Sequence, residues 1–132
     1  MNLKILAVED DEESAKLIKE ILGPYFELEV ATTGEEALEI VDQFKPDIVL
    51  LDRRLPGISG DEVGKQILAK ESLQNVKIVM VSSLAEQEDI KTGFFAGADF
   101  YLPKPFDHDQ LLALVERIIN AKINENIKDR YL

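Results

Sequence analysis

The sequence contains no cysteine, which excludes disulfide bonds and metal sites built from thiolates. It also contains no apolar run that approaches the length of a membrane span. The amino-terminal stretch MNLKILAVED has an apolar part that is too short for a signal peptide. These absences favour a soluble, cytoplasmic protein with no membrane partner.

Positively charged residues are scarce as well. The sequence has 15 Lys and Arg residues and 26 Asp and Glu residues, which gives a formal net charge of −11. A surface with this charge repels nucleic acid and anionic membranes. We therefore expect no direct contact with nucleic acid, and a basic partner is easier to accommodate. The 132 residues, 45% of them hydrophobic, suit one compact domain.

Short apolar runs, bounded by polar or turn residues, recur between longer segments with helical spacing. This alternation predicts an α/β fold in which helices cover both faces of a parallel sheet. We expect strands at residues 3–8, 28–31, 47–51, 77–81 and 99–102. We expect helices from residue 11 to Gly23, from Thr33 to Pro46, over residues 59–71 and 86–96, and from about residue 107 onwards.

Polar or charged residues stand at four of the five strand ends. They are Glu9, Asp10 and Asp11 after the first strand, Asp52 after the third, Ser82 and Ser83 after the fourth, and Lys104 with Pro105 after the fifth. In open α/β sheets the ligand site lies beyond the carboxyl ends of the strands, at the topological switch point. We therefore expect these residues to converge on one site.

Such a set of residues suits the transfer of a phosphoryl group onto a carboxylate. Carboxylates packed together raise one another's pKa unless a cation neutralises them, and Mg²⁺ does this with one or two carboxylates, a backbone carbonyl and waters. An ionised Asp52 can then attack phosphorus and form an acyl phosphate. Lys104 would offset the phosphoryl charge, and a serine hydroxyl can donate a hydrogen bond to a phosphoryl oxygen.

Four motifs carry a family resemblance: VEDD, LLDRRLPGISG, MVSS and AGADFYLPKPF, in this order over residues 3 to about 119. In combination they resemble the receiver domain of two-component response regulators. The resemblance implies a flavodoxin-like, doubly wound sheet of five parallel strands in the order 2-1-3-4-5. It assigns residues 1–119 to the receiver domain and leaves residues 120–132 as a helical extension or linker.

The resemblance also implies a metal site around the phosphoacceptor, which it places at Asp52. Asp10 and Asp52 match direct Mg²⁺ ligands, and Glu9 matches the acid that holds a metal-bound water. The main-chain carbonyl of Arg54 matches the third protein ligand. No further cofactor is implied.

Three further positions match the residues that respond to the phosphoryl group in this family. Ser82 matches the conserved Ser or Thr, and Lys104 matches the invariant lysine, which is followed by a cis proline, here Pro105. Tyr101 matches the switch aromatic. On the residues alone, Tyr101 is equally well explained as a packed aromatic side chain.

The function implied is a phosphorylation switch and not an enzyme that acts on other molecules. Asp52 would accept a phosphoryl group from a histidine kinase or a histidine phosphotransfer protein and lose it slowly by hydrolysis. The surface formed by the fourth helix, the fifth strand and the fifth helix would then change toward a downstream effector domain or protein. Ser14, Ala15 and Ile18 of the first helix form a plausible docking surface for the phosphodonor.

Two arginines follow Asp52, and the second departs from the family pattern. The position of Arg54 usually holds an uncharged side chain, so its guanidinium could lie over the phosphoryl group and block the attacking water. We therefore predict that Arg54 tunes the lifetime of the phosphorylated state. Arg53 is interpreted as a solvated or helix-capping side chain.

Two other functions stay open as alternatives. A Mg²⁺-dependent phosphatase with an aspartyl nucleophile needs a second acid two residues after the first, and Arg54 occupies that place. A receiver-like binding module that is never phosphorylated would lack an acid, the acceptor Asp or the Lys, and none of these is missing. Ile119, Ile123 and Ile127 continue the last helix at i, i+4 spacing, either as a linker or homodimer contact or as a frayed tail.

Overall fold

The computed structural model of the protein describes residues 3–84 and 86–131, with side chains as far as residue 124. Its five strands form one parallel sheet in the order β2-β1-β3-β4-β5. The strands are β1 (Lys4–Val8), β2 (Glu27–Ala31), β3 (Ile48–Asp52), β4 (Lys77–Ser82) and β5 (Phe100–Pro103). The flavodoxin-like sheet and its strand order are therefore confirmed.

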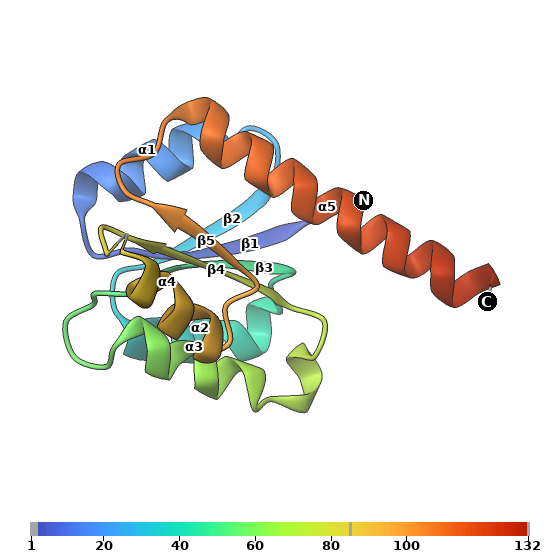
Figure 1. Ribbon diagram of the computed structural model, residues 1–132, viewed down its shortest axis with the longest axis horizontal. Coiled ribbons are helices and arrows are strands. Elements are labelled where there is room, and N and C mark those ends of the chain that lie inside the picture. The colour runs from blue at the N-terminus through green and yellow to red at the C-terminus, as the bar shows by residue number, and fades with distance from the viewer. Residues whose placement is uncertain (1–2, 85, 132) are drawn as a thin grey trace.

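The helices alternate with the strands and cover both faces of the sheet. They are α1 (Glu12–Leu22), α2 (Gly34–Phe44), α3 (Gly60–Leu68), α4 (Gln87–Phe95) and α5 (His108–Tyr131), with a short 3-10 helix at Glu71–Leu73. Helices α1 and α5 lie on one face, and α2, α3 and α4 lie on the other (Figure 1). This is the doubly wound arrangement that the alternation of segments predicts.

Two apolar cores lie on the two sides of the sheet, and neighbouring residues of each central strand contribute to opposite cores. Ile5 and Ala7 pack under α1 and α5, whereas Leu6 and Val8 pack under α2 and α3. Such strands read as continuous apolar runs because both of their faces are buried. All five residues of β3 are buried, including Asp52 at its end.

Polar side chains fix the helix starts. Asp11, Thr33 and Ser59 are the N-caps of α1, α2 and α3, and each accepts a hydrogen bond from the backbone N–H three residues later. These starts agree with the predicted ones. The predicted helix over residues 59–71 was too long, because α3 ends at Leu68, where the N–H of Ala69 bonds back to Lys65, and the 3-10 helix is separate.

Strands β3 and β5 both begin one residue later than expected. Asp47 and Asp99 stand just before them, and their carboxylates accept the backbone N–H of Lys4 and Ile78 on the neighbouring strands. Each aspartate therefore anchors the start of its strand with its side chain. Strand β5 also extends to Pro103, which pairs with Ser82 of β4.

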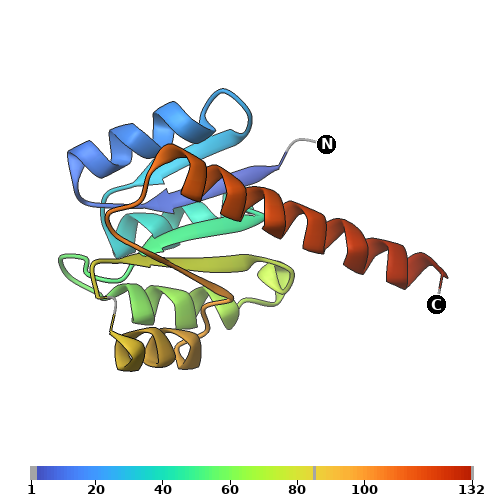
Figure 2. The ribbon, with the colours of Figure 1, turned by 45° about the horizontal axis from the view of Figure 1, so that its top comes forward.

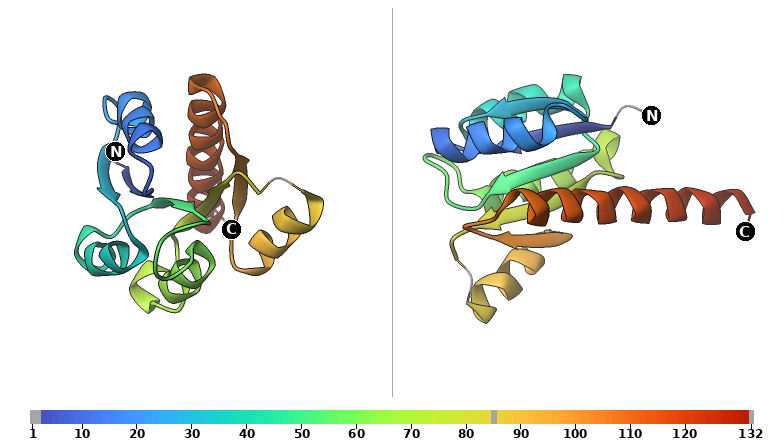
Figure 3. Two further views of the ribbon diagram at one scale, coloured as in Figure 1. Left: turned by 90° about the vertical axis from the view of Figure 1, so that its left-hand side faces the viewer. Right: turned by 90° about the horizontal axis from the view of Figure 1, so that it is seen from above.

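Helix α5 continues without a break past residue 119 to Tyr131 and leaves the body of the domain as a projecting helix (Figures 2 and 3). Residues 120–131 are therefore helical, and whether they serve as a linker or as a dimer contact stays a prediction. Ile119 packs against the core and Ile123 is 41% exposed, while the side chain of Ile127 lies outside the described residues. None of the described helices is both long and apolar enough to cross a bilayer.

Candidate functional site

The site lies at the carboxyl ends of β1, β3, β4 and β5, where the sequence predicts it. Within the described part of the chain, the buried polar or charged residues are Glu9, Asp52 and Ser82, which are 2%, 7% and 1% exposed. All three are predicted site residues. Because burying polar groups is costly unless they find partners, their concentration at one end of the sheet makes this end the candidate functional site.

Lys104 brings two of these strand ends together. Its Nζ donates hydrogen bonds to Glu9 Oε1 at 2.5 Å and to Asp52 Oδ2 at 3.1 Å. Its own backbone N–H donates to the carbonyl of Ser82 at 2.8 Å, and the peptide bond to Pro105 is cis, as predicted. Lys104, at the end of β5, is therefore bonded to the ends of the other three strands, through its ammonium group to Glu9 and Asp52 and through its backbone to Ser82.

Three carboxylates form an acidic group at this point. Oxygens of Glu9, Asp10 and Asp52 lie within 4.8 Å of one another; the first and last are buried and Asp10 is exposed. Hard oxygen ligands that combine buried acids with one open side suit Mg²⁺. The N–H of Arg54 donates to Asp52 Oδ1 at 3.0 Å, so the main chain of Arg54 lies beside the same carboxylate.

The electrostatics of the group follow from burial. Burial, together with the hydrogen bond and charge of Asp52, raises the pKa of Glu9 to about 7, while Lys104 acts in the opposite direction. Burial alone would lower the pKa of Lys104, but hydrogen bonds and charges of Glu9 and Asp52 outweigh it and raise that pKa. A divalent cation would relieve the remaining negative charge.

Asp11 follows Glu9 and Asp10 in the sequence, but its carboxylate is not part of the acidic group of Glu9, Asp10 and Asp52. Its carboxylate accepts the N–H of Ser14 at 2.9 Å and caps α1. This hydrogen bond lowers the pKa of Asp11. Its role is to start the helix.

Ser82 and Tyr101 meet at one residue of the loop after β4. Ser82 Oγ accepts the N–H of Leu84 at 3.1 Å, and the Tyr101 hydroxyl donates to the Leu84 carbonyl at 2.5 Å. The Tyr101 ring lies on Gly93 of α4, where an added Cβ would be 2.8 Å from Tyr101 Cε2. Tyr101 is thus packed against α4 and hydrogen-bonded next to the site.

The interpretation of Arg53 was wrong, because its side chain is neither solvated nor a helix cap. The side chain is 10% exposed. Its guanidinium donates to both carboxylate oxygens of Asp61 in α3, at 2.8 and 3.0 Å, and to Thr92 Oγ1 at 2.7 Å and the Asp89 carbonyl in α4. The hydrogen bond to Asp61 raises the pKa of Arg53 above its usual value. Arg54, by contrast, is exposed.

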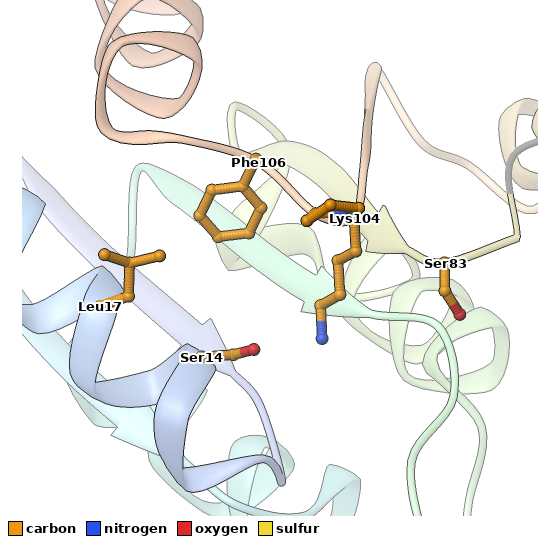
Figure 4. Close-up of a pocket in the computed structure, with 6 residues that line it drawn as sticks. Ser14, Leu17, Ser83, Lys104 and Phe106 are labelled. Carbon is orange, nitrogen blue, oxygen red and sulfur yellow. The ribbon is translucent and has the colours of Figure 1, made fainter.

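A cavity of about 260 Å³ opens on the other side of Lys104, between α1 and the loops that follow β4 and β5 (Figure 4). It is lined by Ser14, Leu17, Ser83, Lys104, Pro105 and Phe106. Ser14 and Ala15 are half-buried, and of the two only Ser14 lines this cavity, whereas Ile18 is 2% exposed and belongs to the core. Ile18 therefore cannot contribute to a docking surface, contrary to the expectation.

The chain matches known families over nearly its whole length. The model of the response regulator receiver domain matches residues 5–116. The DNA-binding response regulator MtrA of Mycolicibacterium paratuberculosis is 37% identical over 126 residues, which are 95% of this chain and 55% of MtrA. The chemotaxis protein CheY of Halobacterium salinarum is 33% identical over 122 residues, 92% of this chain and all of CheY. The chain thus spans about half the length of MtrA and the full length of CheY.

Solved structures agree with these matches. The BeF3-activated receiver domain of DrrB superposes with a TM-score of 0.83 at 33% identity, covering 91% of this chain and 99% of that one. The CheY-like receiver domain protein of Methanospirillum hungatei superposes with a TM-score of 0.86 at 28% identity, covering 95% and 99%.

Proposed function

The chain belongs to the response regulator receiver domain family of two-component systems, and on this premise we propose that Asp52 is its phosphoacceptor. The observation that carries the proposal is the contact of Lys104 with both Glu9 and Asp52 at the carboxyl ends of the strands. The donor is a phosphohistidine of a histidine kinase or of a histidine phosphotransfer protein. The protein acts in the cytoplasm as a switch.

In the transfer step, a carboxylate oxygen of Asp52 forms a bond to phosphorus while the bond from phosphorus to the donor imidazole nitrogen breaks. The electron pair of that bond stays on the nitrogen of the imidazole. Lys104 lies 3.1 Å from Asp52 Oδ2 and offsets the negative charge that arrives with the phosphoryl group. Ser82, whose Oγ accepts the N–H of Leu84, can turn its hydroxyl hydrogen toward a phosphoryl oxygen.

The acidic group has the donor set that Mg²⁺ prefers. Asp10 and Asp52 would hold the ion directly together with the main-chain carbonyl of Arg54, and Glu9 would hold it through a water. The bound ion would neutralise the carboxylates and the phosphoryl oxygens, so that one anion could approach another. The buried positions of Glu9 and Asp52 orient these ligands before the donor arrives.

The phosphodonor approaches over the cavity beside Lys104 (Figure 4). Its walls include Leu17 and Phe106, which suit an imidazole ring, and Ser14, which can hydrogen-bond. Lys104 links this cavity to the acidic group, because it lines the cavity and its Nζ contacts Glu9 and Asp52.

Phosphorylation is read out on the surface of α4, β5 and α5 by an effector domain or a separate effector protein. Ser82 and Tyr101 both bind Leu84, so a movement of Ser82 toward the phosphoryl group changes the partner of Tyr101. Hydrolysis of the acyl phosphate, slow and without another enzyme, resets the switch.

The exposed Arg54 tunes this hydrolysis. Its guanidinium can hydrogen-bond to a phosphoryl oxygen and hinder the attacking water. Phosphate release from the purified phosphoprotein is expected to change in Arg54→Asn and Arg54→Met relative to the wild type. Equal release rates in all three would remove Arg54 from this role.

One experiment tests the proposed function itself. The protein is incubated with acetyl phosphate and Mg²⁺, and the intact mass is recorded. We expect a gain of one phosphoryl group that is lost in Asp52→Asn and on chelation of Mg²⁺, and that is kept in Asp42→Asn, an acid on α2 paired with Lys70. No gain with any donor would favour the binding module, and a gain that persists in Asp52→Asn would place the acceptor elsewhere.

A further inference from the structure

The side chain of Arg53 joins two helices across the residue that follows the phosphoacceptor. It donates two hydrogen bonds to Asp61 in α3 and two to α4, at Asp89 and Thr92. Its main chain is also fixed, since its N–H donates to Val81 and its carbonyl accepts from Gly60. An arginine that is tied at both ends and only 10% exposed is placed to hold one element against another.

The element held by Arg53 has little else to hold it. Gly93 is the buried residue of α4, whereas α1, α2 and α3 each bury three or four residues. Apolar burial is the main force that fixes a helix on a sheet, so α4 depends on polar contacts to an unusual degree.

The Tyr101 ring packs against the same part of α4, at Gly93. An added Cβ at Gly93 would lie 2.8 Å from Tyr101 Cε2 and 3.6 Å from the Arg53 guanidinium, so both side chains flank this glycine. The Tyr101 hydroxyl then donates to Leu84, whose N–H is bound by Ser82. The position of α4 therefore decides whether the Tyr101 ring has its packing surface.

We propose that Arg53 is a positioning residue that couples the state of Asp52 to Tyr101 by holding α4 against α3. The inference rests on the proposed function, because it concerns how the state of Asp52 reaches the α4 and β5 surface. Without the contacts of Arg53 to Asp89 and Thr92, α4 no longer presents Gly93 to the ring. The phosphoryl chemistry at Asp52 then continues, while Tyr101 stops responding to it.

The test uses the whole chain with fluorotyrosine in place of tyrosine, and the fluorine resonance of Tyr101 is assigned with Tyr101→Phe. Spectra are recorded with Mg²⁺ before and after addition of beryllofluoride, the form in which the DrrB receiver domain is described as activated. Phosphorylation by acetyl phosphate is measured in parallel by intact mass. Lys65→Met, which removes an exposed charge from α3, is the matched control for Arg53→Met.

In Arg53→Met we expect the change in the Tyr101 resonance to be at least about twofold smaller than in the wild type, with the extent of phosphorylation kept. Arg53→Lys is expected not to restore the response, because one ammonium group cannot span Asp61 and α4 together. Thr92→Val removes one contact of Arg53 with α4 but keeps the ion pair between Arg53 and Asp61. It replaces Arg53→Met if that variant fails to fold, and it should also make the change in the Tyr101 resonance smaller. Lys65→Met should match the wild type.

A full Tyr101 response in folded Arg53→Met or in Thr92→Val would overturn the inference and leave the proposed function standing. A wild-type Tyr101 resonance that does not respond to beryllofluoride would also overturn it, since there would be no response to couple. If instead the wild type takes up no phosphoryl group from any donor, the proposed function itself fails, and the mass measurement reports this separately.

Discussion

Helices α1 and α4 lie on opposite faces of the same sheet and are held in different ways. Helix α1 buries Ile18, Ile21 and Leu22 in the core that it shares with α5. Helix α4 buries Gly93 and exposes Phe94 and Phe95, which are 46% and 80% accessible. One helix is fixed by apolar packing, and the other is placed by the hydrogen bonds of Arg53 and by the Tyr101 ring.

This difference separates the two tasks of a receiver domain. The acidic group lies at the end of β3 and directly after β1, and apolar residues of these two strands are buried in the two cores, so the cores fix where the group lies. A hydrogen bond to a charged group contributes about 1.5 to 3 kcal/mol, and a fully buried Leu or Ile side chain contributes a similar amount. Arg53 makes two such hydrogen bonds to α4, whereas α1 buries three such side chains, so fewer contacts hold α4 in place. In the proposed switch, the phosphoacceptor belongs to the firmly packed region, and the surface that changes belongs to the more weakly held region next to it.

The largest effect is expected where apolar packing fixes a helix. Ile21→Ala, in α1, removes a side chain that is 1% exposed and should lower the free energy of unfolding by about 2 to 5 kcal/mol. Urea denaturation followed by circular dichroism measures it. A loss below about 1 kcal/mol would mean that α1 is no better anchored than α4.

The second prediction concerns the acidic group and pH. The pKa of Glu9 is about 7 in the folded protein and near 4.5 when unfolded, so between these values the folded state keeps a proton that the unfolded state has lost. Without Mg²⁺, stability should therefore fall as pH rises through this window. Glu9→Gln has no charge to bury at this position. At about pH 8 its free energy of unfolding should therefore exceed that of the wild type by about 1 to 3 kcal/mol.

The same variant has its own control. Near pH 4.5, Glu9 is protonated in the folded state, so the difference between Glu9→Gln and the wild type should become small. Mg²⁺ should stabilise the wild type more than the variant at high pH. Parallel stability curves for the two proteins across the window would contradict the raised pKa of Glu9.

The third prediction concerns the contact between Tyr101 and α4. In Gly93→Ala the new Cβ would collide with the Tyr101 ring, while alanine improves the helix by about 1 kcal/mol, so net stability should change little. The ring should lose its hydrogen bond to Leu84. Tyr101→Phe should then cost about 1 kcal/mol in the wild type and almost nothing in the Gly93→Ala background. Equal costs in both backgrounds would show that Gly93 does not position Tyr101.

The smallest effect is expected on the exposed side of α4. Phe95 is 80% exposed, so Phe95→Ala should change the free energy of unfolding by less than about 0.5 kcal/mol. The same denaturation experiment as for Ile21→Ala gives a direct comparison. A loss above about 1 kcal/mol would mean that Phe95 is covered in solution.

The location of the site could be predicted from the sequence because its residues obey a rule of the fold. Parallel strands bring their carboxyl ends to one side of the sheet, so Glu9, Asp52, Ser82 and Lys104 had to meet once their strands were recognised. Asp52 could be singled out in the sequence because it is the charged residue that ends an apolar run. The roles of these residues in phosphoryl transfer stay predictions.

The role of Arg53 could not be predicted from sequence pattern. Its partners Asp61, Asp89 and Thr92 are 8, 36 and 39 residues away, and the last two depend on where α4 lies on the sheet. Side-chain periodicity reports which face of a helix is apolar, and α4 has a weak apolar face. Similarly, Ile18 was expected on a docking surface because it lies one helical turn after Ser14. That spacing does not show that its side chain is buried in the core.

The two outer strands of the sheet also limit how this domain associates. An uncovered strand can recruit a strand from another chain, which is a common route to aggregation. Here β5 has four residues and ends in Pro103, which has no N–H to offer, and β2 exposes Glu27 and Glu29. Neither border of the folded sheet is a good template for strand addition, so partners of the folded domain are left to bind through the helices and loops.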